Sequence, residues 1–286
     1  MTQIGVQAMM LKNDFANNGV LATLQAVREI GYRAVEISQV PMTAENVAEL
    51  GRARDELGMK IGALSASLTS APGSPNESLS DDFDKIVADA RALDCSMLRI
   101  GMLPMDAMRS LDAVLEFCDR SDEMALWLAE QGIRLYYHNH HIEFTKYEGK
   151  FLLDIIAEHA PHMGFEIDVH WVHRGGLDPV KTLRKYADRV AMVHLKDYRI
   201  GKLSQDAFDK LDAGDRAGFM AAFTGVVQFA EVGEGNLDFA EIVPVSQEIG
   251  AEYLLVEQDD QYGRTPLECL RTSHDNLVAL GFGELF

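Results

Sequence analysis

Four short apolar runs in this chain of 286 residues each end at side chains that can bind a divalent metal. Neutral imidazole and carboxylate groups are ligands that suit Mn²⁺, Co²⁺, Fe²⁺ or Zn²⁺, and the end of a strand holds them on rigid backbone. The runs and their candidate ligands are RLYYHNHHIEF with His138, His140 and Glu143, GFEID with Asp168, MVHLKD with His194, and YLLVEQD with Glu257. We therefore interpret the chain as a metal-dependent enzyme.

Such a site supports the abstraction of a proton next to a carbonyl group. A divalent ion that coordinates a carbonyl and a neighbouring hydroxyl acidifies the adjacent C–H and stabilises the enediolate that forms. The base needs a pKa near the working pH, so His138, His140 or a carboxylate such as Glu257 are candidates, and we favour His140. Alternate residues of a strand share a face, so His138 and His140 could instead only line the interior of the fold.

Three further side chains near these runs are candidates for substrate contact. Lys196 lies two residues beyond His194 and is expected to polarise a substrate oxygen or to pair with a carboxylate. Glu36, at the end of the run AVEIS, is expected to bind a hydroxyl group of the substrate, with a helix cap or a salt bridge as the alternative. Trp171 offers a face on which a substrate ring can stack, or else it covers the top of the fold.

The ligands depend for their positions on a regular alternation of strand-like and helix-like segments. Strand-like runs begin near Gln3, Arg33, Lys60, Ser96, Ile133, Gly164, Val190 and Glu252. Helical periodicity covers residues 21–30, 44–57, 81–93, 105–131, 151–159, 179–186, 239–249 and 266–280. This alternation predicts a parallel sheet, and closure into a single (β/α)8 TIM barrel over residues 1–286 accounts for it better than an open sheet.

In such a barrel the C-terminal ends of all strands point toward one mouth, so residues far apart in the sequence meet there. Asp168, His194 and Glu257 end the sixth, seventh and eighth expected strands. An extra stretch at about residues 199–231 follows the seventh strand, and we place it as an insertion on the same face. It is either a lid or an ordinary surface excursion.

The motifs together resemble the xylose isomerase-like TIM barrels, a family that includes sugar phosphate isomerases and epimerases and inosose dehydratases. The resemblance runs from IGVQ and GYRAVEIS through HNHHIEF, DVHW, GGLDP, VHLKD and VGEGNLDF to YLLVEQD. It implies one divalent ion, held by carboxylate, carboxylate, imidazole and carboxylate groups from the ends of strands five to eight. Three of these ligands fall on Asp168, His194 and Glu257.

The fourth ligand is where this chain departs from the family pattern. Many epimerases of the family have a glutamate where this chain has His138. We favour Glu143, five residues further on, as the ligand, with His138 or His140 as alternatives. The histidine-containing motif is more similar to inosose dehydratases and to enzymes that eliminate groups from keto-sugars.

The resemblance implies a metal-dependent sugar isomerase or epimerase that acts through an enediolate. The alternative is a dehydratase or lyase on a keto-sugar or inosose, and an endonuclease IV-like nuclease or a non-enzymatic sugar-binding protein is less favoured. We expect the cofactor to be one divalent ion, Mn²⁺ in preference to Co²⁺, Fe²⁺, Mg²⁺ or Zn²⁺. Similar proteins are frequently dimers or tetramers, so a homo-oligomer is possible.

Composition limits the possible partners. The formal net charge of −19 opposes binding to nucleic acid and to anionic membrane surfaces. The odd number of cysteines, three, and the lack of a signal-peptide pattern favour a cytoplasmic protein. The glycine turn VGEGNLDF resembles a phosphate-binding loop only weakly, because Glu234 lies between its glycines. The expected substrate is therefore an unphosphorylated sugar or polyol.

Overall fold

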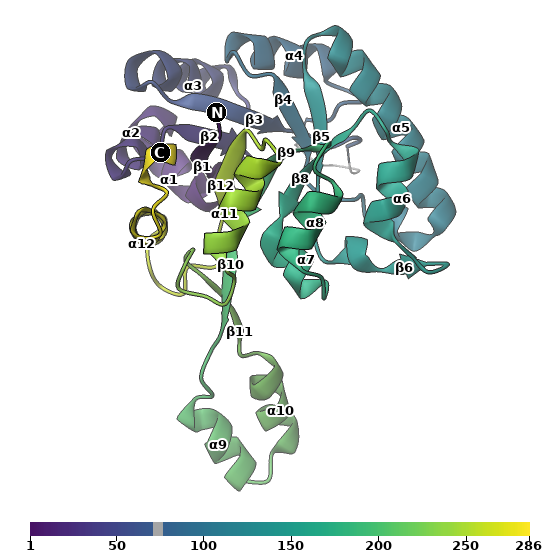
Figure 1. The fold of residues 1–286 in the computed structure, drawn as a ribbon. Helices are drawn as coiled ribbons and strands as arrows, with labels where there is room; N and C mark the ends of the chain where they lie inside the picture. Colours follow the sequence, from purple (N-terminus) through teal and green to yellow (C-terminus); the bar gives the residue numbers. More distant parts are fainter. Residues whose placement is uncertain (71–76) are drawn as a thin grey trace.

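The computed structural model describes residues 1–70 and 77–286 of the chain. Eight parallel strands close into a barrel in the order β1-β12-β9-β8-β5-β4-β3-β2 (Figure 1). They are β1 (Gln3–Gln7), β2 (Ala34–Ile37), β3 (Lys60–Ser65), β4 (Met97–Ile100), β5 (Arg134–His138), β8 (Gly164–Asp168), β9 (Val190–Leu195) and β12 (Tyr253–Val256). Each strand lies at a predicted run, so the TIM barrel expected from the alternation is confirmed.

Helices pack around the outside of this barrel. Those predicted from periodicity are α2 (Val20–Ile30), α3 (Ala44–Leu57), α4 (Phe83–Ala92), α5 (Leu111–Glu130), α6 (Leu152–His159), α8 (Pro179–Lys185), α11 (Phe239–Glu248) and α12 (Pro266–Ala279). The segment 105–131 was expected to be one helix, but α5 begins only after Ser110. The side chain of Ser110 accepts a hydrogen bond from the backbone N–H of Ala113, and this N-cap separates α5 from the short turn η2 (Ala107–Arg109).

Several short elements were not predicted. They are η1 (Ala8–Leu11), α1 (Lys12–Asn18), η3 (Ile142–Phe144), β6 (Lys146–Tyr147), β7 (Lys150–Phe151), α7 (Val169–Arg174) and η4 (Gly283–Leu285). All of them except η4 follow the C-terminal ends of barrel strands. They are too short to show a helical or alternating period of their own.

The insertion after β9 forms an arm. It consists of the antiparallel strands β10 (Asp197–Ile200) and β11 (Val227–Ala230), with α9 (Gln205–Asp212) and α10 (Arg216–Thr224) between them. Figure 1 shows the two helices projecting away from the barrel at the end of this ribbon. Within the described ranges of the chain, no helix has the length and apolar character needed to cross a membrane.

Inward-facing side chains change from apolar to charged along the barrel strands. Residues two apart on a strand share a face, and an apolar cluster inside the barrel contains Met97, Tyr136, Met192 and Leu255. Two residues further along the same strands lie Arg99, His138, His194 and Glu257, all of them buried. The barrel therefore carries its buried charges at the C-terminal ends of its strands.

Candidate metal centre

Asp168 ends β8 and also begins the following helix. Its Oδ1 accepts a hydrogen bond of 3.0 Å from the backbone N–H of Trp171, so it is the N-cap of α7. Its own backbone N–H donates to Oδ1 of Asn139 at 3.0 Å. These contacts fix the carboxylate and leave Oδ2 without a hydrogen-bond partner among the described residues. One oxygen of Asp168 is therefore free to bind a ligand.

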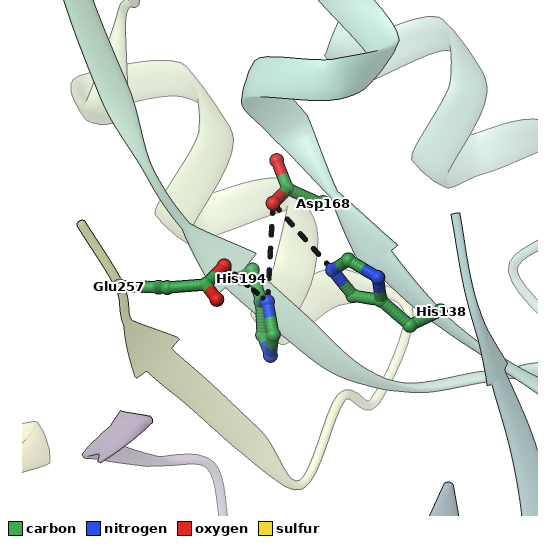
Figure 2. A group of neighbouring side chains, drawn as sticks. All are labelled: His138, Asp168, His194 and Glu257. Atoms are coloured by element: carbon green, nitrogen blue, oxygen red, sulfur yellow. Dashed lines mark hydrogen bonds and ion pairs between the residues drawn. The ribbon is translucent and has the colours of Figure 1, made fainter. Parts of the chain in front are cut away.

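Four side chains from four neighbouring strands meet around this oxygen (Figure 2). One ligand atom each of His138, Asp168, His194 and Glu257 lies within 4.8 Å of the other three, and all four residues are buried. Oδ2 of Asp168 lies 3.5 Å from Nε2 of His138 and 3.8 Å from Nδ1 of His194. Nδ1 of His194 lies 2.9 Å from Oε2 of Glu257. Two imidazoles and two carboxylates thus form a compact donor set.

The donor set fits a divalent metal. Nε2 of His138 and Oδ2 of Asp168 are buried, and neither has a hydrogen-bond partner within the described part of the chain. Buried polar atoms normally have a partner, so two such atoms only 3.5 Å apart suit a cation that contacts both. Nδ1 of His138 lies 3.2 Å from the carbonyl oxygen of Gly101, which favours a proton on Nδ1 and a free lone pair on Nε2. Burial, with His194 and Arg99 nearby, lowers the pKa of His138 and keeps it neutral.

Glu143, which we favoured as the fourth ligand, lies outside this group. Its Oε1 accepts a hydrogen bond of 2.5 Å from the hydroxyl of Tyr137, and its Oε2 accepts one of 2.7 Å from the backbone N–H of His140. Both oxygens are therefore engaged in holding the loop after β5. His138, one of the two alternatives considered from the sequence, occupies the fourth position instead.

Glu36 does not contact the four-residue cluster at the side of Asp168 and His138. It is fully buried inside the barrel, where it pairs with Arg99 and lies 2.9 Å from Nε2 of His194. Burial alone would raise the pKa of Glu36, but the positive charges of Arg99 and His194 outweigh it and lower the pKa. Its placement supports the salt-bridge alternative rather than a contact with a sugar hydroxyl.

Arg99 and Glu166 were missed by the sequence reasoning. Arg99 is 4% exposed and Glu166 is fully buried, and Nε of Arg99 lies 3.1 Å from Oε2 of Glu166. Burial and the neighbouring charge of Glu36 raise the pKa of Glu166 to about 8. The available signal was a charged residue within an otherwise apolar strand, in SMLRIGM and GFEID.

Lys196 lies beside the four-residue cluster. Its Nζ is 3.2 Å from Oε2 of Glu257 and 2.8 Å from a carboxylate oxygen of Asp259. Nζ also lies 5.0 Å from the ring centre of Trp171 and 5.3 Å from that of Phe229, which belongs to β11 of the arm. Burial would lower the pKa of Lys196, but the surrounding carboxylates outweigh burial and raise it, so the amine is a fixed positive charge.

Two neutral histidines complete the surroundings. The ring of His140 lies 4.8 Å from that of His138 and 5.4 Å from that of Trp171, and burial together with His138 lowers the pKa of His140 to about 3. The ring of His170 packs against Phe229 at 5.1 Å, and burial lowers its pKa to about 4. Nδ1 of His140 and both ring nitrogens of His170 have no hydrogen-bond partner in the described ranges.

The backbone N–H groups of the glycine turn after β11 bind a carboxylate of the same chain. The carboxylate of Asp197 accepts hydrogen bonds from the backbone N–H groups of Gly233, Gly235, Asn236 and Leu237, at 2.9 to 3.1 Å. A Cβ atom at Gly235 would lie 2.2 Å from Oδ1 of Asp197, so this close approach requires glycine. The donors that a phosphate would need are thus occupied.

Comparison with known proteins finds that the chain is similar to several carbohydrate-processing enzymes. An inosose dehydratase from Clostridium perfringens is 35% identical over 145 residues, which cover 49% of this chain and 45% of that protein, so the match spans less than half the length of the relative. A solved sugar phosphate isomerase/epimerase from Parabacteroides distasonis has a TM-score of 0.74 at 21% identity, over 97% of this chain and 98% of that one. A 3-keto-D-glucoside 4-epimerase from E. coli has a TM-score of 0.67 at 16% identity, over 98% and 99% of the two chains.

The two solved structures show the same fold. The family model described as xylose isomerase-like TIM barrel matches residues 24–276, which is most of the chain. The closed eight-stranded barrel agrees with that match, and the chain belongs to the xylose isomerase-like TIM barrel family.

Proposed function

We propose that this chain is a metal-dependent enzyme that removes a proton next to the carbonyl group of an unphosphorylated sugar or polyol. The observation that carries the proposal is the convergence of His138, Asp168, His194 and Glu257 at the barrel mouth. A divalent cation, which we expect to be Mn²⁺, would be held by these four side chains and would acidify the C–H next to a substrate carbonyl. The bonding of Asp197 to the glycine turn supports a substrate without a phosphate.

The residues around the cluster supply complementary proton chemistry. Burial lowers the pKa of His140 to about 3, so its imidazole is unprotonated but only weakly basic. We keep it as the base because its Nδ1 is buried and has no hydrogen-bond partner among the described residues. Lys196 supplies a fixed positive charge, because its raised pKa keeps Nζ protonated; it can donate a hydrogen bond to a substrate oxygen and stabilise the negative charge that develops there. Trp171 borders both residues and offers a ring face for the substrate.

Two outcomes follow from this first step. Return of the proton to carbon gives isomerisation or epimerisation, which is the outcome that the sequence alone favoured. Loss of a β-hydroxyl gives dehydration. The relatives named inosose dehydratase favour dehydration. The leaving hydroxyl would depart as water with the proton that the base removed, and the ammonium of Lys196 can donate a hydrogen bond to it. We therefore propose dehydration of a keto-polyol as the reaction, with epimerisation as the alternative.

Proton NMR in D₂O tests the common step and the outcome together. Protein loaded with Mn²⁺ would be incubated with an inosose and with a panel of ketoses, and the substrate exchanged into diamagnetic buffer before measurement. We expect loss of the signal of the proton next to the carbonyl. Signals of a product that has lost a hydroxyl group indicate dehydration, and signals of an isomer that carries deuterium next to the carbonyl indicate isomerisation or epimerisation. Full activity of protein that EDTA has freed of metal would contradict the proposal.

A further inference from the structure

A buried charged group with no catalytic assignment lies directly beneath the metal ligands. Glu36 and Glu166 are fully buried, and Arg99, only 4% exposed, lies between them. Nε of Arg99 pairs with Glu36 and is 3.1 Å from Glu166, and its Nη2 donates to Oγ of Ser38 at 2.9 Å. Burying ions is costly even when they are paired, so a stability role alone is a weak explanation for this group.

His194 connects this buried group to the metal ligands. Its Nδ1 faces Glu257 at 2.9 Å, and its Nε2 faces the opposite way, 2.9 Å from Oε2 of Glu36 and 3.1 Å from Oε1 of Glu166. The contact with Glu36 has hydrogen-bond geometry, whereas Glu166 has no hydrogen-bond partner among the described residues. A neutral imidazole binds a metal through one nitrogen and carries its proton on the other.

The structure assigns Glu36 as a positioning residue for the proposed metal site, on whose existence this inference rests. Glu36 accepts the Nε2–H of His194, and Arg99 keeps the Glu36 carboxylate in place. In the metal-free protein the surrounding carboxylates outweigh burial and raise the pKa of His194 well above its usual value, so each ring nitrogen carries a proton. An ion at the cluster would take the place of the proton on Nδ1, while Glu36 keeps the proton on Nε2. Glu36 therefore decides which nitrogen of His194 binds the ion and fixes the plane of its ring.

Two observations support this assignment over alternatives. The carboxylates of Glu36 and Glu166 with His194 also form a group that could hold a second cation. However, Arg99 already lies within ion-pair distance of both carboxylates and supplies the positive charge that such a cation would bring. In addition, His138 is held in the reverse sense, with Nδ1 on the carbonyl of Gly101 and Nε2 at the cluster. Each imidazole thus has an acceptor on the side away from the cluster.

The test compares Mn²⁺ binding to apoprotein variants by isothermal titration calorimetry. We expect E36Q to raise the Kd by about 10–100-fold, the usual effect of losing an acceptor behind a metal-binding histidine. The glutamine side chain has no negative charge to pair with Arg99. Its NH₂ group can also turn toward Nε2 of His194, which disfavours a proton on that nitrogen. The matched control is M97L, a conservative change two residues before Arg99 on β4, which we expect to leave the Kd unchanged.

A second measurement does not depend on the folding of a variant. Wild-type protein with ¹⁵N-labelled histidine would be loaded with Zn²⁺, which is diamagnetic, and examined by NMR. We expect one metal-bound imidazole with Nδ1 on the ion and a slowly exchanging Nε2–H. Binding of Mn²⁺ to E36Q as tight as to wild type, or Nε2 of His194 on the ion, would overturn the inference alone. A wild-type protein that binds no divalent ion would overturn the metal proposal as well.

Discussion

Nδ1 of His194 lies 2.9 Å from Oε2 of Glu257, although the two residues are 63 positions apart in the chain. Strands β9 and β12 are neighbours in the barrel and pair in parallel, with Leu195 opposite Val256. The residues near their C-terminal ends therefore share one edge of the barrel. A side chain at this edge acquires its chemistry from the neighbouring strand rather than from its neighbours in sequence.

The first prediction concerns these two ligands. H194A and E257Q should each reduce bound Mn²⁺ to a trace and abolish turnover, because H194A removes one of the four donor atoms and E257Q removes the negative charge of another. Metal content by mass spectrometry and the thermal unfolding shift on adding Mn²⁺ measure this loss. E252Q is the control, since Glu252 precedes β12 and makes an exposed pair with Arg134. If both ligand variants bound metal like E252Q, the cluster would not be the metal site.

A second pair of variants decides the fourth ligand. H138A should lose metal, because Nε2 of His138 faces Asp168 at 3.5 Å. E143Q should keep it, because both oxygens of Glu143 are bonded to Tyr137 and to the backbone of His140. E143Q should instead lower the free energy of unfolding by about 1–3 kcal/mol, since a partner of buried hydrogen bonds is weakened. The reverse result, with metal lost from E143Q and kept by H138A, would restore the carboxylate that the sequence favoured.

The barrel itself was predictable because each strand and helix has a local signature. The predicted strands begin within one residue of the observed ones, and glycines such as Gly58 end helices in the left-handed conformation. The convergence of Asp168, His194 and Glu257 was predictable because parallel strands of a barrel end at one mouth. The arm was located approximately, since the expected stretch 199–231 corresponds to β10, α9, α10 and β11.

The remaining parts of the site depend on contacts that no local pattern records. The sequence does not reveal that the Tyr137 hydroxyl donates a hydrogen bond to the carboxylate of Glu143. The carboxylate was therefore predicted to be free to bind a metal. Glu36 has the same spacing from its strand end whether it faces a substrate or pairs with Arg99, a residue 63 positions away. The role of Phe229 depends on how β11 pairs with β10 and folds back over Lys196.

A third prediction separates metal binding from the chemical step. K196M should keep Mn²⁺ but lower kcat by about 10²–10³-fold, the range expected when a fixed hydrogen-bond donor to a developing negative charge is lost. The measurement is turnover beside metal content for the same preparation. K196R keeps the positive charge and should retain bound metal, but its planar group cannot match the contacts of Nζ with Glu257 and Asp259. Undiminished turnover in K196M would remove Lys196 from the mechanism.

Stability at alkaline pH gives a fourth prediction that does not involve the metal. Burial raises the pKa of Cys95 to about 11 and those of Cys118 and Cys269 to about 12. Unfolded thiols ionise near pH 8.5, so above that pH the unfolded chain binds fewer protons than the native one. The stabilisation is complete below about pH 8.5 and is lost as the pH rises toward about 11. Urea unfolding between pH 8 and 11 should show this fall, and C95A should make it shallower; an unchanged slope would contradict the assignment.

The last prediction concerns the base of the arm. Phe229 lies on β11 with its ring centre 5.3 Å from Nζ of Lys196, and its backbone N–H donates to the hydroxyl of Tyr262 at 3.0 Å. F229A should lower kcat/KM by about 2–30-fold, which corresponds to the 0.5–2 kcal/mol of a cation–π contact. F223A is the matched control, because Phe223 lies on α10 in the outer part of the same arm and is 53% exposed. If the base of the arm contributes to the site, only F229A should change the kinetics. Equal effects of the two variants would instead indicate that the arm acts through its overall stability.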